Sequence, residues 1–362
     1  MPSSAVISDV QIAALRTIQG VQIGQFGPGE IITCSWSREK SEVSRCELTV
    51  PRVDGPGGHP LVQPWLHWIS VWDGSGQEMY WDGPVRKVTV NADTMTLECR
   101  DLAALHTRTR SPLTKKWDKA SPVDIAEEVV HGLIEHHGLR VAPIARPDPW
   151  IDRYDYTTTS DSQMVEAVMN DLTQMGLTWS VVSGIPILGP MSRTPLAALG
   201  EDDFAGGGLT LVRDGEDTYN DVLLRGADTL TIARTPMAGL SLQTIVSIDS
   251  MFGVSNVDKA ARQYAGYSAK IHDKLVLPDS AVLHPHAPVR IGQLIPTTRF
   301  TVTAYGATWL MQLTGVDVSY TPGTSSVSVR MEVVDDELPE LVEIKKHPYQ
   351  GGTKGSKDLS AS

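Results

Sequence analysis

Three histidines near one expected helix end are the first residues in this sequence that could bind a metal ion. His131, His136 and His137 follow Glu127 and Glu128 in the same segment. Glu128 and His131 are three residues apart, so on a helix both side chains could face one ion. Histidine is also favourable near the negative pole of a helix dipole. Since the ligand set is incomplete, we interpret this group as a solvated helix end.

A second pair of histidines flanks a proline. His284 and His286 stand on either side of Pro285 in a strand-like segment, and both side chains would point to the same side. A metal site there needs a third ligand, and the neighbouring sequence suggests none. We therefore predict that the protein requires no metal ion and no cofactor.

The three cysteines do not form a recognisable reactive site. Cys34, Cys46 and Cys99 are widely spaced and contain no CxxC pair. An odd number of scattered cysteines is typical of buried thiols in a reducing compartment. A cysteine hydrolase needs a Cys–His pair, but Cys46 and Cys99 lie inside alternating, strand-like runs and are expected to be buried.

Other patterns that carry chemistry are missing or incomplete. The sequence has no nucleophile elbow, P-loop, GxGxxG fingerprint or HExxH motif. The glycine run at 206–208 lacks the Lys-Ser/Thr and the helix of a phosphate site, and the carboxylate clusters at 201–203 and 335–337 are expected to be solvated loop charges. We therefore predict no catalytic residues and no enzyme activity.

Charge and hydropathy exclude several kinds of partner. The 362 residues carry a formal net charge of -12, and no Lys/Arg stripe is visible. Stable binding of nucleic acid needs clustered cations, so it is not expected; an acidic surface could still serve as a conduit through which DNA passes. The N-terminus has no signal-peptide pattern. No apolar run approaches the roughly 18 residues of a membrane span.

The elements are organised around residues 65–105, which we expect to form an antiparallel meander. Three runs rich in Trp, Tyr, Val and Thr are separated by the turn sequences DGSG, DGP and NAD. Val88 and Val90 alternate with Lys87 and Thr89, a period of two that places one face on a core. Earlier strand candidates are at 21–24, 31–38 and 42–50, so residues 1–111 are predicted to form a first β-barrel.

The next part of the chain has helical patterns. Ser121 as N-cap and Pro122 start a helix that Gly138 ends. A second helix is predicted from Ser160, with Gln163 in the capping-box position, to Gly176. A strand over 177–182 follows. Residues 112–195 are therefore expected to form a small α/β unit.

The remaining chain is expected to return to β structure. After a Gly- and Pro-rich loop at 190–208, strands are predicted at 221–226, 229–233 and within 287–334, with one helix over 255–270 that Ser255 caps. Residues 196–344 form this second region, and residues 345–362 are a Gly-, Lys- and Ser-rich tail that cannot fold alone. The predicted fold class is α+β, mainly β, with two small antiparallel barrels and the α/β unit between them.

Several local patterns resemble phage tail hub proteins, the baseplate-hub and tail-tip proteins related to the base of type VI secretion spikes. The patterns are TCSWSREKSEVSRCELTV at 33–50, WDGPV at 81–85 leading to LECRDL at 97–102, the two helices with the strand at 179–182, and PVRIGQLI at 288–295, which resembles a strand of the hub. Their order along the chain is most similar to that in tail proteins of the long-tailed phages, or siphoviruses, that infect actinobacteria.

This resemblance implies a structural virion protein that forms a homotrimer. Each subunit would contribute two tail-tube-like barrels, so that three subunits match a hexameric tail tube. The ring would connect the tube to the tip and surround the channel through which the tape-measure protein and then DNA leave. Implied partners are distal tail or tube-ring proteins, the tape-measure protein, and other minor tail or central-fibre proteins. The tail at 345–362 is expected to make mostly intermolecular contacts.

Two other functions stay open. Nine tryptophans suggest a carbohydrate-binding adhesin, for which exposed Trp65, Trp68 and Trp72 would form aromatic platforms; alternatively they are core and interface anchors. A cell-wall hydrolase at the tail tip would need a catalytic dyad in a cleft, and the sequence indicates none.

Overall fold

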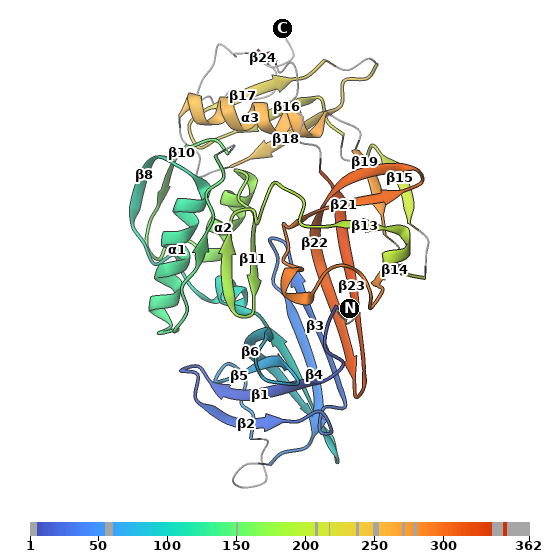
Figure 1. The fold of residues 1–362 in the computed structure, drawn as a ribbon. Coiled ribbons are helices and arrows are strands. Elements are labelled where there is room, and N and C mark those ends of the chain that lie inside the picture. The colour runs from blue at the N-terminus through green and yellow to red at the C-terminus, as the bar shows by residue number, and fades with distance from the viewer. Residues whose placement is uncertain are drawn as a thin grey trace.

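Strands dominate the computed structural model of the chain, and its helices lie on two sides of the molecule (Figure 1). Among the described residues, no helix is long and apolar enough to cross a bilayer. The structure describes residues 6–54, 61–149, 151–206, 209–216, 218–236, 239–248, 253–269, 272–277, 281–334 and 343–345.

One large sheet runs through most of the molecule. Its hydrogen-bonded order is β14-β20-β23-β22-β3-β4-β7-β6-β5-β1-β2, and β21 pairs with both β22 and β13. The strands are β1 (Gln11–Thr17), β2 (Gln22–Phe26), β3 (Thr33–Glu39), β4 (Arg45–Pro51), β5 (His67–Asp73), β6 (Met79–Val90), β7 (Thr94–Arg100), β13 (Ala198–Gly200), β14 (Phe204–Ala205), β20 (Val282–Leu283), β21 (Arg299–Ala304), β22 (Ala307–Thr321) and β23 (Thr324–Val333).

The predicted meander is present as β5, β6 and β7, but the turn expected at 82–84 is wrong. Asp82, Gly83 and Pro84 lie inside β6 and pair with β5, and Gly83 is small because the Arg100 carbonyl lies against it. The turns of the meander use the side chains that the sequence indicated: Asp73 Oδ1 accepts hydrogen bonds from the backbone N–H of Gln77 and Glu78, and Asn91 Oδ1 accepts one from the N–H of Thr94. The strand candidates at 21–24, 31–38 and 42–50 correspond to β2, β3 and β4. Turn chemistry and alternation therefore predicted these strands, but misplaced one turn inside β6.

The first and last β regions do not stand apart as two separate barrels. Strand β22 is 15 residues long and pairs with β23 on one side and with β3 on the other. Buried residues of both regions belong to one hydrophobic core. Hydrogen bonding closes no barrel among the described residues. The length of β22 explains this. Its first part pairs with β21, and its second part extends beyond β21 and pairs with β3 of the first region.

The middle of the chain packs helices against two small sheets. The start and end predicted for the first helix are confirmed: Ser121 Oγ accepts a hydrogen bond from the Asp124 N–H at 3.1 Å, and Gly138 has a φ of 62°. A second hydrophobic core joins this part to buried residues between Val222 and Ala265. Its elements are β8 (Lys115–Ala120), α1 (Pro122–His136), β9 (Ile144–Ala145), β10 (Tyr154–Thr158), α2 (Val165–Gln174), β11 (Trp179–Val182) and β12 (Ile185–Leu188).

Two predicted helix starts are wrong. Helix α2 begins at Val165 with Met164 as N-cap, five residues after Ser160, because the preceding backbone bonds elsewhere: the Val165 N–H donates to the Thr109 carbonyl. The third helix, α3 (Val254–Ser268), has Gly253 as N-cap with a φ of 87°. Ser255 therefore lies inside its first turn.

The end of the chain differs from prediction in three further places. Residues 288–295 form no strand; they contain the 3-10 helix η4 (Ile291–Gln293). The expected loop at 190–208 holds β13, η3 (Glu201–Asp203) and β14. Lys345, expected to start the tail, is the last residue of β24 (Glu343–Lys345), which pairs with β17. The rest of the tail, residues 346–362, and the carboxylate cluster at 335–337 lie outside the described residues.

A four-stranded sheet carries α3 on one side. Its order is β18-β16-β17-β24, and α3 lies across β16 and β17 (Figure 1). The strands of this sheet that have not yet been given are β16 (Asp221–Arg225), β17 (Leu230–Arg234) and β18 (Gln243–Ser247). Strands β15 (Thr210–Asp214) and β19 (His272–Val276) form a separate two-stranded sheet.

Candidate functional site

The large sheet presents one polar face to solvent. Strands β23, β22, β3, β4, β7 and β6 lie side by side, and because strand side chains alternate between faces, every second residue points away from the core. The register aligns these residues in rows across the strands. One row is Ser326, Ser319, Ser35, Glu47, Glu98 and Lys87, and a second contains Thr33, Thr49, Thr96 and Thr89.

Charges of opposite sign neutralise one another on this polar face. Arg330 Nη2 lies 2.7 Å from Glu39 Oε1 and 3.2 Å from Asp317 Oδ2. Burial acts to lower the pKa of Arg330, but the contacts with these carboxylates outweigh it and raise the pKa. Lys87 Nζ lies 2.6 Å from Glu98 Oε1 and lowers the pKa of that carboxyl group. The charged residues on the face include Lys40, Arg45, Arg86, Lys87, Arg100, Arg330, Glu39, Glu47, Glu98, Asp317 and Glu332.

The same strands bury their other face. Cys34, Cys46 and Cys99 lie there, each about 1% exposed or less, as the alternation predicted. Burial raises the pKa of the Cys46 and Cys99 thiols, which keeps them protonated and unreactive as nucleophiles. These cysteines therefore support the sheet.

Buried Arg38 ties this core to the segment around η4. Its Nη1 donates to the Ile291 and Leu294 carbonyls at 2.7 and 3.1 Å, and its Nη2 donates to the Tyr80 carbonyl at 2.8 Å. Burial lowers its pKa to about 10, so the group stays charged at neutral pH. These bonds explain why residues 288–295 turn at η4, where a strand was expected.

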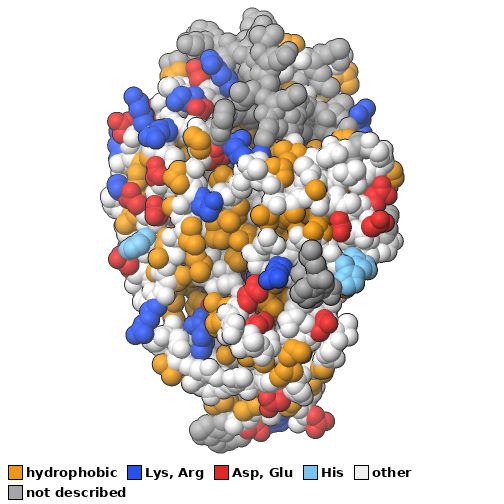
Figure 2. Space-filling model, in the orientation of Figure 1, with side chains coloured by type: hydrophobic (Ala, Val, Ile, Leu, Met, Phe, Trp, Pro, Cys, Tyr) orange, Lys and Arg blue, Asp and Glu red, His pale blue; other side chains and the backbone are white. Residues whose placement is uncertain are grey.

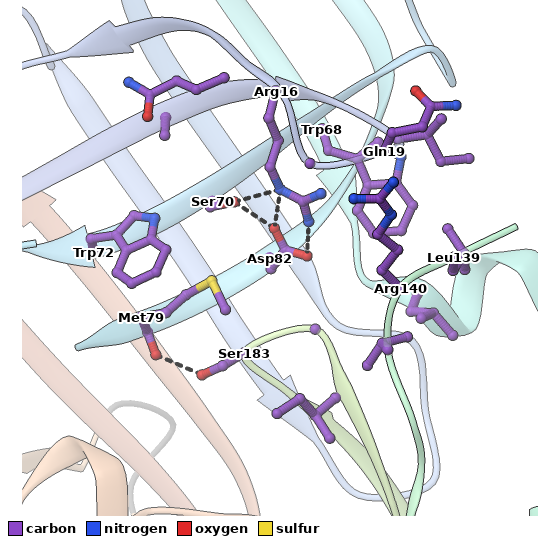
Figure 3. A pocket seen from close by; sticks show the side chains of 18 of the residues that line it. Arg16, Gln19, Trp68, Ser70, Trp72, Met79, Asp82, Leu139, Arg140 and Ser183 are labelled. Atoms are coloured by element: carbon purple, nitrogen blue, oxygen red, sulfur yellow. Dashed lines mark hydrogen bonds and ion pairs between the residues drawn. The ribbon is translucent and has the colours of Figure 1, made fainter. Parts of the chain in front are cut away.

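A hollow of about 800 Å³ lies on another part of the large sheet. Its floor is formed by β2, β1, β5 and β6, and the opposite wall is formed by residues 139–142 and the β11–β12 turn (Figure 3). Ala14 pairs with Ser70, and Ser70 pairs with Asp82, in the middle of the floor. Because Ala14 and Ser70 are small, they leave space that longer side chains would fill.

Arg16 and Asp82 form a partly buried ion pair in this hollow (Figure 3). Arg16 Nε also donates to Ser70 Oγ at 2.9 Å, and Ser70 Oγ donates to Asp82 Oδ1 at 2.6 Å. Burial raises the pKa of Asp82, while Arg16 and Ser70 act in the opposite direction. The Arg16 guanidinium lies 5.0 Å from the Trp68 ring centroid. This network fixes the polar centre of the hollow.

The structure does not assemble the predicted metal candidates. His131 Nδ1 lies 3.6 Å from Glu135, whereas Glu128 bonds to Lys115 and to Trp117 Nε1 on β8. His137 Nε2 lies 2.7 Å from Thr109 Oγ1. Among the described residues, no group of three or more His, Cys, Asp or Glu could hold a metal ion. The absence of a metal requirement stays a prediction.

The histidines, glycines and carboxylates named elsewhere in the sequence also stay apart. The His284 and His286 rings lie 5.1 Å apart, without a third ligand in the part of the chain that the structure describes. Asp203 Oδ2 accepts a hydrogen bond from the Gly200 N–H, so the 201–203 cluster caps its own 3-10 helix. Gly207 and Gly208 lie outside the described residues.

The three tryptophans of the adhesin alternative do not form one exposed platform. Trp65 is 37% exposed and Trp68 is 3% exposed, while Trp72 is half-buried in the hollow. Sequence reasoning missed the hollow. Its only signals were the alternation at 12, 14 and 16 and at 68, 70 and 72, which could not show that the two strands pair.

Comparison with known proteins identifies solved structures that have a similar fold. No protein-family model matches the sequence, and no curated protein matches it. The tail protein from Neisseria meningitidis has a TM-score of 0.62 at 12% identity, covering 91% of this chain and 98% of that chain. The 43 kDa tail protein of prophage MuSo2 from Shewanella oneidensis has a TM-score of 0.57 at 13% identity, covering 89% and 98%.

A component of a PdpA–VgrG complex is also similar. A chain of the Francisella PdpA–VgrG complex has a TM-score of 0.53 at 10% identity, covering 92% of this chain and 59% of that chain. This chain therefore shares its fold with tail proteins and with a VgrG complex component along nearly its whole length.

Proposed function

We propose that this protein is a structural hub of a phage tail tip or baseplate. Three copies form a ring that connects the hexameric tail tube to the tip and surrounds the channel for the tape-measure protein and DNA. The polar face of the large sheet carries this proposal, since it is continuous across both β regions. The fold shared with phage tail proteins supports it.

The chemistry of the polar face suits the wall of a water-filled channel. Serine and threonine hydroxyls form its central rows, and they hydrogen-bond equally well to water and to a passing chain. Basic and acidic side chains are interspersed on the face, so most of their formal charges cancel. DNA binding needs clustered cations without carboxylate partners, and several cations of this face lie beside a carboxylate. The lining we propose is therefore close to neutral, where the sequence suggested an acidic one.

The trimer follows from the two β regions in each chain. The first region supplies β3, β4, β7 and β6 to the polar face, and the last supplies β22 and β23. Three copies would place six regions around one axis, which matches a sixfold tube. Figure 2 shows hydrophobic side chains gathered in the middle of one face, over α2, β11 and the neighbouring β21 and β22, a surface suited to subunit contact.

The partners we propose are distal tail or tube-ring proteins, the tape-measure protein, and other minor tail or central-fibre proteins. The virion tail tip is the proposed location, and the proposed role includes no catalysis. Figure 2 shows basic and acidic side chains interspersed, without an area of one sign. This distribution fits a protein that lets DNA pass without binding it.

Particle composition tests the ring directly. We expect three copies per tail by cryo-imaging of intact virions, and a trimer or an assembly-dependent trimer by mass photometry. A stable dimer, or a monomer in intact tails, would overturn the hub proposal.

A charge substitution tests the channel wall. Ser35→Arg adds an unpaired cation to the polar face, and we expect virions carrying it to release DNA more slowly in vitro, because the new cation binds phosphate. Gln77→Arg, in the exposed turn between β5 and β6, is the matched control and should not change the rate. Equal rates for wild type and both variants would show that the face is not the channel wall.

A further inference from the structure

We propose that the hollow at Arg16 is a binding site for a small anionic sugar, a ring that carries a carboxylate or phosphate group. The site is distinct from the polar face and does not depend on the hub function. It lies between the floor of β2, β1, β5 and β6 and the wall of residues 139–142 and 183–185. Its volume of about 800 Å³ is within the usual range for small-molecule sites.

The charge of the lining selects an anion. Of all residues that line the hollow, Arg16, Arg140 and Asp82 are the charged ones, which gives a formal charge of +1 in a chain whose net charge is -12. Arg16 and Ser70 already donate hydrogen bonds to Asp82. The carboxylate is therefore satisfied from within the protein, and donors remain for a ligand.

Two of these donors belong to arginines from opposite walls. Arg16 reaches Asp82 and Ser70 through Nε and Nη2, and its Nη1 has no hydrogen-bond partner among the described residues. Arg140 is exposed, and in Figure 3 its side chain extends from the far wall toward Gln19 and Trp68. Two guanidinium groups in one hollow can hold a carboxylate or phosphate between them.

A third donor is buried and unsatisfied. Trp68 is 3% exposed, and its indole Nε1–H has no hydrogen-bond partner in the part of the chain that the structure describes. An unpaired buried N–H is unfavourable. Trp68 lines the hollow, so an acceptor atom of a ligand could satisfy this group.

The other lining groups fit a sugar ring. Gln19, Gln22 and Gln25 line the side next to β2, and side-chain amides both donate and accept, as sugar hydroxyls do. Trp72 and Ile12, paired across β1 and β5, supply apolar surface for the C–H face of a ring. Gln22 Nε2 donates to Gln25 Oε1 at 3.2 Å, and a purely apolar acid would make no use of the remaining amide donors and acceptors.

Titration of the full-length chain with three sugars tests the proposal. The probes are glucuronate, glucose 6-phosphate and glucose, followed by calorimetry and by the indole N–H signals of protein labelled with ¹⁵N-tryptophan. We expect one or both anionic sugars to bind at least tenfold more tightly than glucose and to shift the Trp68 indole signal. The preferred anion distinguishes a sugar acid from a sugar phosphate.

Matched arginine variants locate the binding. Arg140→Gln should weaken the anionic sugar at least tenfold, whereas Arg86→Gln, on the exposed outer part of β6, should leave affinity unchanged. Unchanged circular dichroism shows that both variants fold. Equal affinity for glucose and the anionic sugars, no binding of any sugar, or equal loss in both variants would overturn the proposal. Benzoate binding more tightly than glucuronate would overturn the assignment to a sugar.

Discussion

The polar face and the hollow are two parts of one sheet, yet their surfaces are opposite in kind. Strand β6 contributes to both, with Lys87 and Thr89 on the polar face and Met79 and Asp82 in the hollow. On the polar face the charges are mostly exposed. In the hollow, small central residues leave space and the Asp82 side chain is only 5% exposed. Both surfaces lie on hydrogen-bonded strands of the same sheet, so strand pairing does not distinguish them. The small side chains in the middle of the hollow do.

This difference separates two physical roles. A broad face with hydrated charges and hydroxyls along several strands offers a passing molecule many similar weak contacts, which suits a channel wall. A recessed, partly buried ion pair holds its geometry and can discriminate one ligand from another. The following experiments test this contrast, from the largest expected effect to the smallest.

A carboxylate on the buried side of β22 should have the largest effect. Met311 is fully buried and pairs with Phe300 and Val333. Met311→Asp should lower the free energy of unfolding by more than about 3 kcal/mol, because its paired neighbours are apolar and the new charge has neither water nor a cation beside it. Ser319→Asp, on the polar face of the same strand, should change it by about 0.5 kcal/mol or less. Urea unfolding measures both, and similar losses would contradict the two-faced sheet.

Removal of Arg16 should have the next largest effect. Arg16→Gln leaves the Asp82 carboxylate buried without its cation, and we expect a loss of about 1–3 kcal/mol at pH 7, less than for a fully buried pair because the Arg16 side chain is 21% exposed. The additional change Asp82→Asn should recover part of the loss. If the double variant is less stable than Arg16→Gln, the carboxylate is not the cause.

Local signals in the sequence predicted the elements that depend on near neighbours. Ser121, Pro122 and Gly138 fixed α1 because caps act within one turn. Alternation in β4 and β7 predicted that Cys46 and Cys99 are buried. Ser160 misled because its segment bonds to the chain around Thr109, some fifty residues earlier, and no local pattern contains that contact.

Long-range register could not be read from the sequence. The β22–β3 pairing joins residues such as Val318 and Trp36, and many offsets would satisfy the same alternation. The hollow depends on two such pairings, because Ala14 must meet Ser70 and Ser70 must meet Asp82. Its second wall comes from another part of the chain. For the histidine candidates, incomplete spacing predicted the lack of a third ligand, and the absence of a metal requirement stays a prediction.

Acid should weaken the packed junction behind the hollow. His106 lies in the 3-10 helix η2 (Leu102–Arg108), with its ring 5.3 Å from the Trp179 ring, and burial lowers its pKa to about 4. The unfolded chain has the ordinary pKa of 6.5, so on acidification from pH 6.5 toward 4 only the unfolded state gains the proton. This residue's contribution to stability is therefore present above pH 6.5 and is lost as the pH falls.

A phenylalanine at this position removes the titration. Between pH 7.5 and 5.5 we expect the wild type to lose about 1 kcal/mol more than His106→Phe, measured by urea unfolding. Exposed His131 on α1 provides the control, since His131→Gln should follow the wild type. A wild-type curve parallel to that of His106→Phe would show that His106 does not carry the acid sensitivity.

The smallest effect should come from an ion pair on the polar face. Lys87 and Glu98 lie 2.6 Å apart, with side chains 63% and 34% exposed, whereas the Arg16–Asp82 pair is largely buried. Exposed pairs contribute about 0.2–1 kcal/mol because water screens them and ordering long side chains opposes them. A double-mutant cycle of Lys87→Ala and Glu98→Ala should therefore give a coupling of about 0.5 kcal/mol or less, which decreases further at high salt. A coupling above about 1.5 kcal/mol would mean that this ion pair stabilises the fold substantially. The pairing of charges on the polar face could then be explained by stability, without a role in keeping the face close to neutral.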